Sequence, residues 1–144
     1  MANAMSDYLE AKLLSWLTQG AAMPTAPTNV YCGLFTVLPA DTGTSGAPAD
    51  GTEVTAANGY ARVAISTSGG FSAISASSTK QHATNASTVT FPQATGSWGT
   101  IVGYGLWDAS SAGNLLFYAS ITSQAITANE TPSLAAGQID AGMD

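Results

Sequence analysis

The sequence predicts a mainly β protein, with an antiparallel β-sandwich or barrel-like core and one N-terminal amphipathic α-helix. Two observations carry this prediction. The stretch Trp98–Ile121 holds two apolar runs of strand length around a segment rich in Gly, Asn, Asp and Ser, which is the pattern of a β-hairpin. Residues 6–19 show helical periodicity and are followed by strand-length apolar runs bounded by turn residues.

Length and composition predict a single domain over residues 1–144, with a helix at 6–19 and a β core over 29–144. Charged residues make up 8% of the chain, against about 25% in ordinary soluble domains. A surface with so few charges is weakly protected against association with other proteins, so we expect partners to cover much of it. The alternative is a surface protein with an uncharged Ser/Thr coat.

The net charge of −6 argues against two classes of partner. The three basic residues, Lys12, Arg62 and Lys80, do not cluster in the sequence, whereas a phosphate backbone needs clustered Lys and Arg. We therefore expect neither nucleic acid nor an acidic membrane surface as a partner. No secretion signal is recognisable, and no run reaches the roughly 18 apolar residues of a membrane span, so a soluble protein is expected.

The predicted helix begins at Ser6, a good N-cap, and ends at Gly20, which suits the position after the last turn. Its apolar residues recur at helical spacing and form one stripe: Leu9, Leu13, Trp16 and Leu17. This stripe packs either on the sheet of its own chain or against a neighbouring subunit. Its four residues are candidates for contact with another subunit.

Residues 29–38 are apolar on both faces and predict a central buried strand, in which Cys32 is a structural residue. The following segment, residues 39–59, is a long loop rich in Gly, Pro, Asp and Thr. Loops of this length commonly serve contact, so its acidic residues Asp41, Asp50 and Glu53 are further contact candidates. Their spacing matches no EF-hand, and a solvated acidic loop is the expectation rather than a calcium site.

Later strands are predicted from shorter signals. Residues 60–67 alternate like a strand with one wet face, and residues 87–91 form a short strand that ends at Pro92. The Ser/Thr-rich stretch 68–86 forms a short strand or an exposed excursion. Alternation over residues 139–144 suggests a final edge strand that its charges protect from aggregation.

The residues of the chain argue against an enzyme. One His, His82, and one Cys, Cys32, cannot build a Cys/His zinc site. A Ser-His-Asp triad would have to use His82, in a segment expected to be exposed and poorly ordered. No nucleophile elbow or phosphate loop is present, and Asp108 is expected to shape the hairpin turn. No catalytic, cofactor-binding or metal-ligating residue is predicted.

With these residues laid out, the chain resembles the small virion proteins of tailed bacteriophages, which include capsid decoration (cement) proteins and so-called tail fibre proteins. The resemblance rests on MSDYLEAKLLSWL, on VYCGLFT, on GTEVTAANGYARVAI and, most specifically, on VTFPQATGSWGTIVGYGLWDASSAGNLLFYASI. It runs along most of the chain and implies a structural role without catalytic or cofactor residues.

The resemblance implies one favoured function and one alternative. The favoured function is a capsid decoration protein, made in the host cytoplasm, that binds between major capsid subunits on the virion surface, commonly as a homotrimer, and stabilises the head. The alternative is a tail fibre or baseplate component that binds the host surface, where an exposed aromatic such as Trp98 could stack on sugars.

Overall fold

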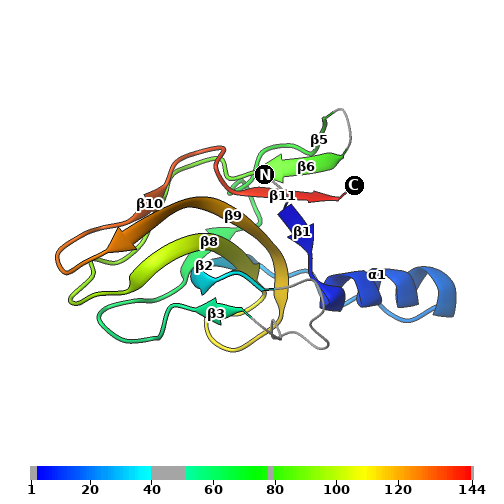
Figure 1. Ribbon diagram of the computed structural model, residues 1–144. Coiled ribbons are helices and arrows are strands. Elements are labelled where there is room, and N and C mark those ends of the chain that lie inside the picture. The colour runs from blue at the N-terminus through cyan, green and yellow to red at the C-terminus, as the bar shows by residue number, and fades with distance from the viewer. Residues whose placement is uncertain (1–2, 40–50, 78–79, 144) are drawn as a thin grey trace.

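The computed structural model describes residues 3–39, 51–77 and 80–143. In it, 43% of the residues are in strands and 10% are helical, which confirms a mainly β protein with antiparallel sheets and one N-terminal helix. The main sheet places its strands in the order β1-β9-β8-β2-β3, and β4 pairs with β2 as well. Figure 1 shows the smaller strands β10, β6 and β11 on one side of this sheet.

The first half of the chain supplies the N-terminal strand, the helix and one central strand. The elements are β1 (Asn3–Met5), α1 (Asp7–Gln19), β2 (Asn29–Val37), β3 (Thr52–Glu53), β4 (Val63–Ser66) and β5 (Ser75–Ala76). Strand β2 is buried along most of its length because β8 lies on one side and β3 and β4 on the other. The predicted central strand is therefore confirmed, and Cys32 is fully buried within it.

The second half of the chain supplies the central hairpin and the covering strands. The elements are β6 (Gln81–Thr84), β7 (Val89–Thr90), β8 (Gly99–Trp107), β9 (Leu115–Ile126), β10 (Ser133–Leu134) and β11 (Asp140–Met143). Strands β8 and β9 pair antiparallel over their whole length, with Tyr104 opposite Ala119. The predicted hairpin is thus the centre of the main sheet.

The hairpin packs tightly because Gly103 and Gly105 on β8 have no side chain. A Cβ added at Gly105 would lie 2.8 Å from atoms of Phe35, Trp107 and Leu115. One added at Gly103 would lie 2.5 Å from the carbonyl oxygen of Ala119. The bulky side chains around β8 therefore occupy the space that any larger residue would need.

The two small sheets cover one face of the main sheet and close the core. Strands β7 and β10 form one antiparallel pair, and β5, β6 and β11 form the other sheet, with β11 at its edge. Phe91, Leu134 and Ile139 from these segments pack against Leu34 and Ile101 of the main sheet in one buried cluster. Side chains of two facing layers make the core, as in a β-sandwich.

Asn85 holds the last strand to the body of the protein. This buried side chain donates to the carbonyl oxygens of Ser87 and Ala135 and accepts from the N–H of Ile139. Two short strands, β5 and β6, come before it in the chain. The predicted final edge strand at the C-terminus is confirmed as β11, and Asn85 explains how a chain end with few apolar residues stays attached.

Several strand boundaries differ from the sequence-based expectation. Strand β9 continues to Ile126, whereas the apolar run of the predicted hairpin ends at Ile121. A register shift opposite Ile101 and Gly103 accommodates the polar residues within the same strand. The strand expected over 60–67 is regular only over Val63–Ser66, because Tyr60 turns into the core.

Candidate interaction surfaces

The helix α1 is attached to the sheet through Ser6. Its side-chain oxygen accepts from the N–H of Leu9 and donates to the carbonyl oxygen of Leu115, while its backbone N–H donates to Leu116. The helix ends at Gly20, which adopts the left-handed conformation with φ +67°. The predicted N-cap and C-terminal glycine are confirmed, and the N-cap also serves as the anchor to β9.

Beyond this anchor, α1 extends away from the sheets at one end of the molecule (Figure 1). No residue of α1 is fully buried. Leu9 and Leu13 are half-buried, whereas the exposed fractions of Leu14, Trp16 and Leu17 are 61%, 50% and 72%. The sequence-based stripe is thus divided along its length, and its C-terminal half is an apolar surface without a partner in the described part of the chain.

Leu14 belongs to this exposed surface although the sequence-based stripe omitted it. The stripe contains only apolar residues at the helical spacing that places them on one face of the helix. Leu14 lies beside that face. Its signal in the sequence was its position between Leu13 and Leu17 in a charge-free half-helix. We call Leu14, Trp16 and Leu17 the helix patch.

The acidic candidates of the long loop have different environments. Asp41 and Asp50 lie outside the described residues. Glu53 lies on β3 and is held by two neighbours: its carboxylate accepts from the hydroxyl of Tyr60 at 2.8 Å and forms a two-point ion pair with Arg62, at 2.8 and 2.7 Å. This carboxylate is engaged within the chain.

Arg62 joins the end of the long loop to the turn of the central hairpin. Its side chain is only 7% exposed. Beside the pair with Glu53, it donates to the carbonyl oxygens of Ala109 and Ala112, and its guanidinium lies over the ring of Trp107. One basic residue thereby satisfies a carboxylate, two turn carbonyls and an aromatic face.

Asp108 shapes the hairpin turn, as the sequence predicts. One of its carboxylate oxygens accepts from the N–H of Asn114 at 2.7 Å, and the other accepts from the side-chain amide of the same residue at 2.8 Å. The turn contains Ala112 and Gly113 with φ of +50° and +71°. The carboxylate of Asp108 is therefore used to close the turn around these two left-handed residues.

Trp98 is buried, so the expectation that it is an exposed aromatic for sugar stacking is wrong. Its exposed fraction is 5%, its ring meets Tyr60 edge-on at 5.2 Å, and its indole N–H donates to the carbonyl oxygen of Asn58. Its polar atom is satisfied by the loop before β4, which lets the whole ring enter the core.

His82 lies on β6 and is ordered, contrary to the expectation of an exposed, poorly ordered segment. Its Nδ1 lies 3.0 Å from one carboxylate oxygen of Asp140, and Lys80 pairs with the other oxygen. Antiparallel pairing of β6 with β11 brings these residues together although about 60 positions separate them in the chain. The cluster ties the terminal strand to its neighbour.

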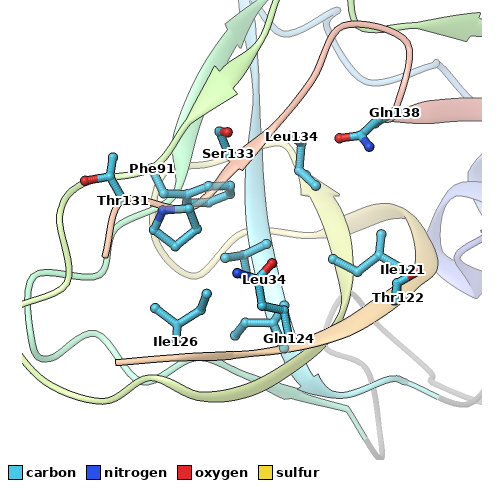
Figure 2. A pocket seen from close by; sticks show the side chains of 12 residues that line it. Leu34, Phe91, Ile121, Thr122, Gln124, Ile126, Thr131, Ser133, Leu134 and Gln138 are labelled. Atoms are coloured by element: carbon cyan, nitrogen blue, oxygen red, sulfur yellow. The ribbon is translucent and has the colours of Figure 1, made fainter. Parts of the chain in front are cut away.

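A groove of about 440 Å³ opens between β9 and the segment that carries β10. Figure 2 shows Leu34 at its floor, Phe91 and Leu134 on one side, and Gln124 and Ile126 on the other. None of the 12 described residues that line it is charged. We call this the β9–β10 groove. Sequence reasoning missed it because its residues come from five separate segments.

The buried thiol of Cys32 and the buried hydroxyl of Tyr60 do not line the β9–β10 groove and serve packing in the core. Burial raises the pKa of the Cys32 thiol far above its usual range, so the sulfur stays protonated and unreactive. Burial likewise raises the pKa of the Tyr60 hydroxyl, and the nearby Glu53 carboxylate adds to this effect. These shifts report packing in the core.

Two searches of the described residues returned nothing. No group of three or more His, Cys, Asp and Glu side chains lies close enough to hold a metal ion. No helix in the described part of the chain is long and apolar enough to cross a membrane.

Comparison with known proteins identifies the family. A search of curated proteins found no match to this chain. The model of one protein family, described as Podophage GP4 fiber I protein gp80, matches residues 4–142 and therefore nearly the whole chain, from β1 to β11. The protein therefore belongs to this family of small virion proteins of tailed bacteriophages.

Proposed function

We propose that this chain is a non-enzymatic structural subunit of a bacteriophage fibre. The observation that carries the proposal is the family match over residues 4–142, because the family is described as a fibre protein. A compact β body with an exposed apolar helix also suits a subunit that is built into a larger assembly. The fibre role replaces capsid decoration, which the sequence alone favoured, as the first proposal.

The contact surface in this proposal is the helix patch of Leu14, Trp16 and Leu17. An apolar surface of this kind, carried on a helix that leaves the body of the protein, suits an interface with another subunit. A homotrimer is the expected assembly, and other virion proteins are the expected neighbours. Receptor binding through Trp98 is not part of the proposal, since that ring is buried.

Labelling of purified virions tests the position. Gold-labelled antibodies against this chain should decorate the fibres, and quantitative mass spectrometry should find few copies relative to the major capsid protein. Labels spread evenly over the head, with hundreds of copies per particle, would instead establish the capsid decoration function and exclude the fibre function. Absence of the chain from washed virions would contradict both.

A further inference from the structure

We propose that the outer edge of β9, together with the β9–β10 groove beside it, binds one extended, uncharged segment of another virion protein, which pairs with β9 as an added strand. The inference rests on the proposed role as a structural subunit and names the kind of partner that this surface accepts. The surface combines a row of unpaired main-chain groups with a groove for side chains.

The outer side of β9 is only partly covered. Strand β8 pairs with one side of β9, whereas β1 pairs with the other side at residues 117–119. In the part of the chain that the structure describes, no strand pairs with the outer side of β9 over residues 122–126. Because alternate N–H and C=O groups of an antiparallel strand point to each side, this stretch offers unpaired donors and acceptors to a further strand.

The sequence of this edge lacks two features that commonly prevent strand addition. Residues 120–129 contain no charged residue and no proline. A bulge of β9 lies between Ser120 and Gln124 and shortens the regular edge. Ile121 and Thr122 both line the groove, although successive residues of a regular strand point to opposite faces. The bulge therefore brings an additional side chain to the groove.

The groove lies directly beside this edge. One wall is β9, with Gln124 and Ile126, and the other is the segment of β10, with Ser133 and Leu134 (Figure 2). Side chains of a strand alternate between its two faces, so those on one face of an added strand would enter the groove. A volume of about 440 Å³ holds a few side chains but not the edge of a second folded body. The occupant is therefore a free, extended segment.

The residues that line the groove select an uncharged occupant. None of the 12 described lining residues is charged, so a charged side chain would lose its hydration there without gaining an ion pair. Within the described part of the chain, four lining side chains make no hydrogen bond: Thr122, Gln124, Thr131 and Ser133. Small side chains such as Ala, Ser, Thr and Val suit this mixed polar and apolar surface.

The unpaired edge distinguishes an extended peptide from other uncharged ligands. A helix bonds its own main-chain groups to one another and would leave the edge of β9 unpaired. A neutral sugar needs an exposed ring on which to stack, but Phe91, the aromatic residue of the lining, is only 2% exposed. An extended segment satisfies the edge and the groove at the same time.

A second copy of the chain does not offer such a segment in its described part. Its strands are already paired within their own sheets. The largely exposed segment 20–28 forms no helix or strand, but it contains Pro24 and Pro27, which have no N–H to donate to β9. The described residues therefore favour a different virion protein as the source of the added strand.

Peptide binding to the full chain tests the proposal. An array of acetylated and amidated eight-residue peptides built from Ala, Ser, Thr and Val supplies the probes, and the peptide that binds most tightly is resynthesised. In nuclear magnetic resonance spectra, this peptide should shift the backbone amides of residues 122–126 and 133–134. The outward amides of β9 should then exchange with solvent at least about 10-fold more slowly, because they have become hydrogen-bonded.

A matched pair of N-methylated peptides separates main-chain pairing from side-chain contact. One version of the resynthesised peptide carries N-methyl groups at its odd positions, and the other carries them at its even positions. Only one of them blocks the N–H groups that face β9, so its affinity should be at least about 10-fold lower than that of the other. The two versions have the same side chains and the same number of methyl groups.

A variant of the groove provides the corresponding test on the protein. Ser133→Trp places a large ring at an exposed position of the lining and should weaken peptide binding by a similar factor. Ile74→Trp adds the same ring at an exposed position outside the lining and should bind as wild type does. Circular dichroism checks that both variants fold. If Ser133→Trp does not fold, the two N-methylated peptides still decide the question on wild type.

Four results would overturn the proposal. One is an array in which no peptide binds at millimolar concentration, and another is equal affinity of the two N-methylated versions. The third is tighter binding of maltoheptaose at the same amides, which would indicate a sugar site. The fourth is a concentration-dependent shift of residues 122–126 in the protein alone, which would indicate a second copy at the edge. None of these results depends on where the protein lies in the virion, so the fibre proposal stands or fails separately.

Discussion

The guanidinium carbon of Arg62 lies 4.0 Å from the centroid of the Trp107 ring. Arg62 follows the long loop and Trp107 ends β8, so the contact joins two segments that are distant in the sequence. The same guanidinium pairs with Glu53 and with the carbonyl oxygens of the hairpin turn. This arrangement orients the end of the long loop relative to the centre of the sheet.

Removal of Arg62 should destabilise the protein strongly. Arg62→Ala leaves the Glu53 carboxylate and two turn carbonyls without their donor in a largely buried place, and we expect a loss of about 3 kcal/mol in the free energy of unfolding. Urea unfolding followed by tryptophan fluorescence measures it. Arg62→Lys keeps the charge but not the planar fork, and should fall between wild type and Arg62→Ala.

A methyl group at position 105 should strain the core. Gly105→Ala places a Cβ 2.8 Å from Leu115, Phe35 and Trp107, and overpacking of this kind costs about 1–3 kcal/mol. The same unfolding experiment applies. Leu115→Ala creates space beside the new methyl group, so its own cost should be smaller in the Gly105→Ala background than in wild type. Equal costs in both backgrounds would show that Leu115 does not cause the strain.

Alkaline pH should weaken the fold through Tyr104. Burial raises the pKa of its hydroxyl from 10.0 to about 12. The unfolded chain therefore loses this proton at a lower pH than the folded chain does. The stability due to Tyr104 is complete below pH 10 and falls between about pH 10 and 12, by about 1.4 kcal/mol per pH unit.

The Tyr104→Phe variant isolates this contribution. Tyr60 and Cys32 also keep their protons longer in the folded state, so wild type loses stability for several reasons in this range. The free energy of unfolding, measured at several pH values, should fall less steeply with pH for Tyr104→Phe than for wild type. The difference in slope should correspond to about one proton released on unfolding. Identical slopes for the two proteins would contradict the assignment.

Loss of the Ser6 hydroxyl should loosen α1. Ser6→Ala removes both the helix cap and the bond to the carbonyl oxygen of Leu115, with an expected cost of about 1 kcal/mol. Hydrogen exchange followed by mass spectrometry should show that the variant exchanges faster than wild type in α1, with a smaller change in β9. Ser6→Thr retains the hydroxyl and should behave much like wild type, whereas protection of α1 unchanged by Ser6→Ala would exclude the anchoring role.

The local elements of the fold could be read from the sequence where a pattern and its boundary residues agree. Ser6 and Gly20 bound the helix, and the turn around Asp108 separates β8 from β9. The family resemblance was also available from sequence motifs alone. Strand ends were less accurate, since β9 continues through polar residues that pair with β8 but carry no apolar signal.

The surfaces proposed for assembly were only partly accessible from the sequence. The stripe of Leu9, Leu13, Trp16 and Leu17 is visible in the spacing of apolar residues, but the same spacing fits a helix that packs on its own sheet. In the structure, α1 leaves Trp16 and Leu17 exposed, so these two side chains do not pack on the sheet of their own chain. The spacing of apolar residues along a helix does not indicate how far the helix lies from the sheet.

The sequence by itself determined a charge-poor, mainly β chain with one capped helix, because composition, periodicity and capping are local properties. Only the tertiary structure decided which side chains come together: Arg62 with Trp107, His82 with Asp140, and Leu34 with Leu134 in one buried cluster. These pairs depend on strand order and register, which link positions from about 45 to 100 residues apart. The central hairpin is visible in the chain, but the surfaces that it supports arise only when the sheets pack.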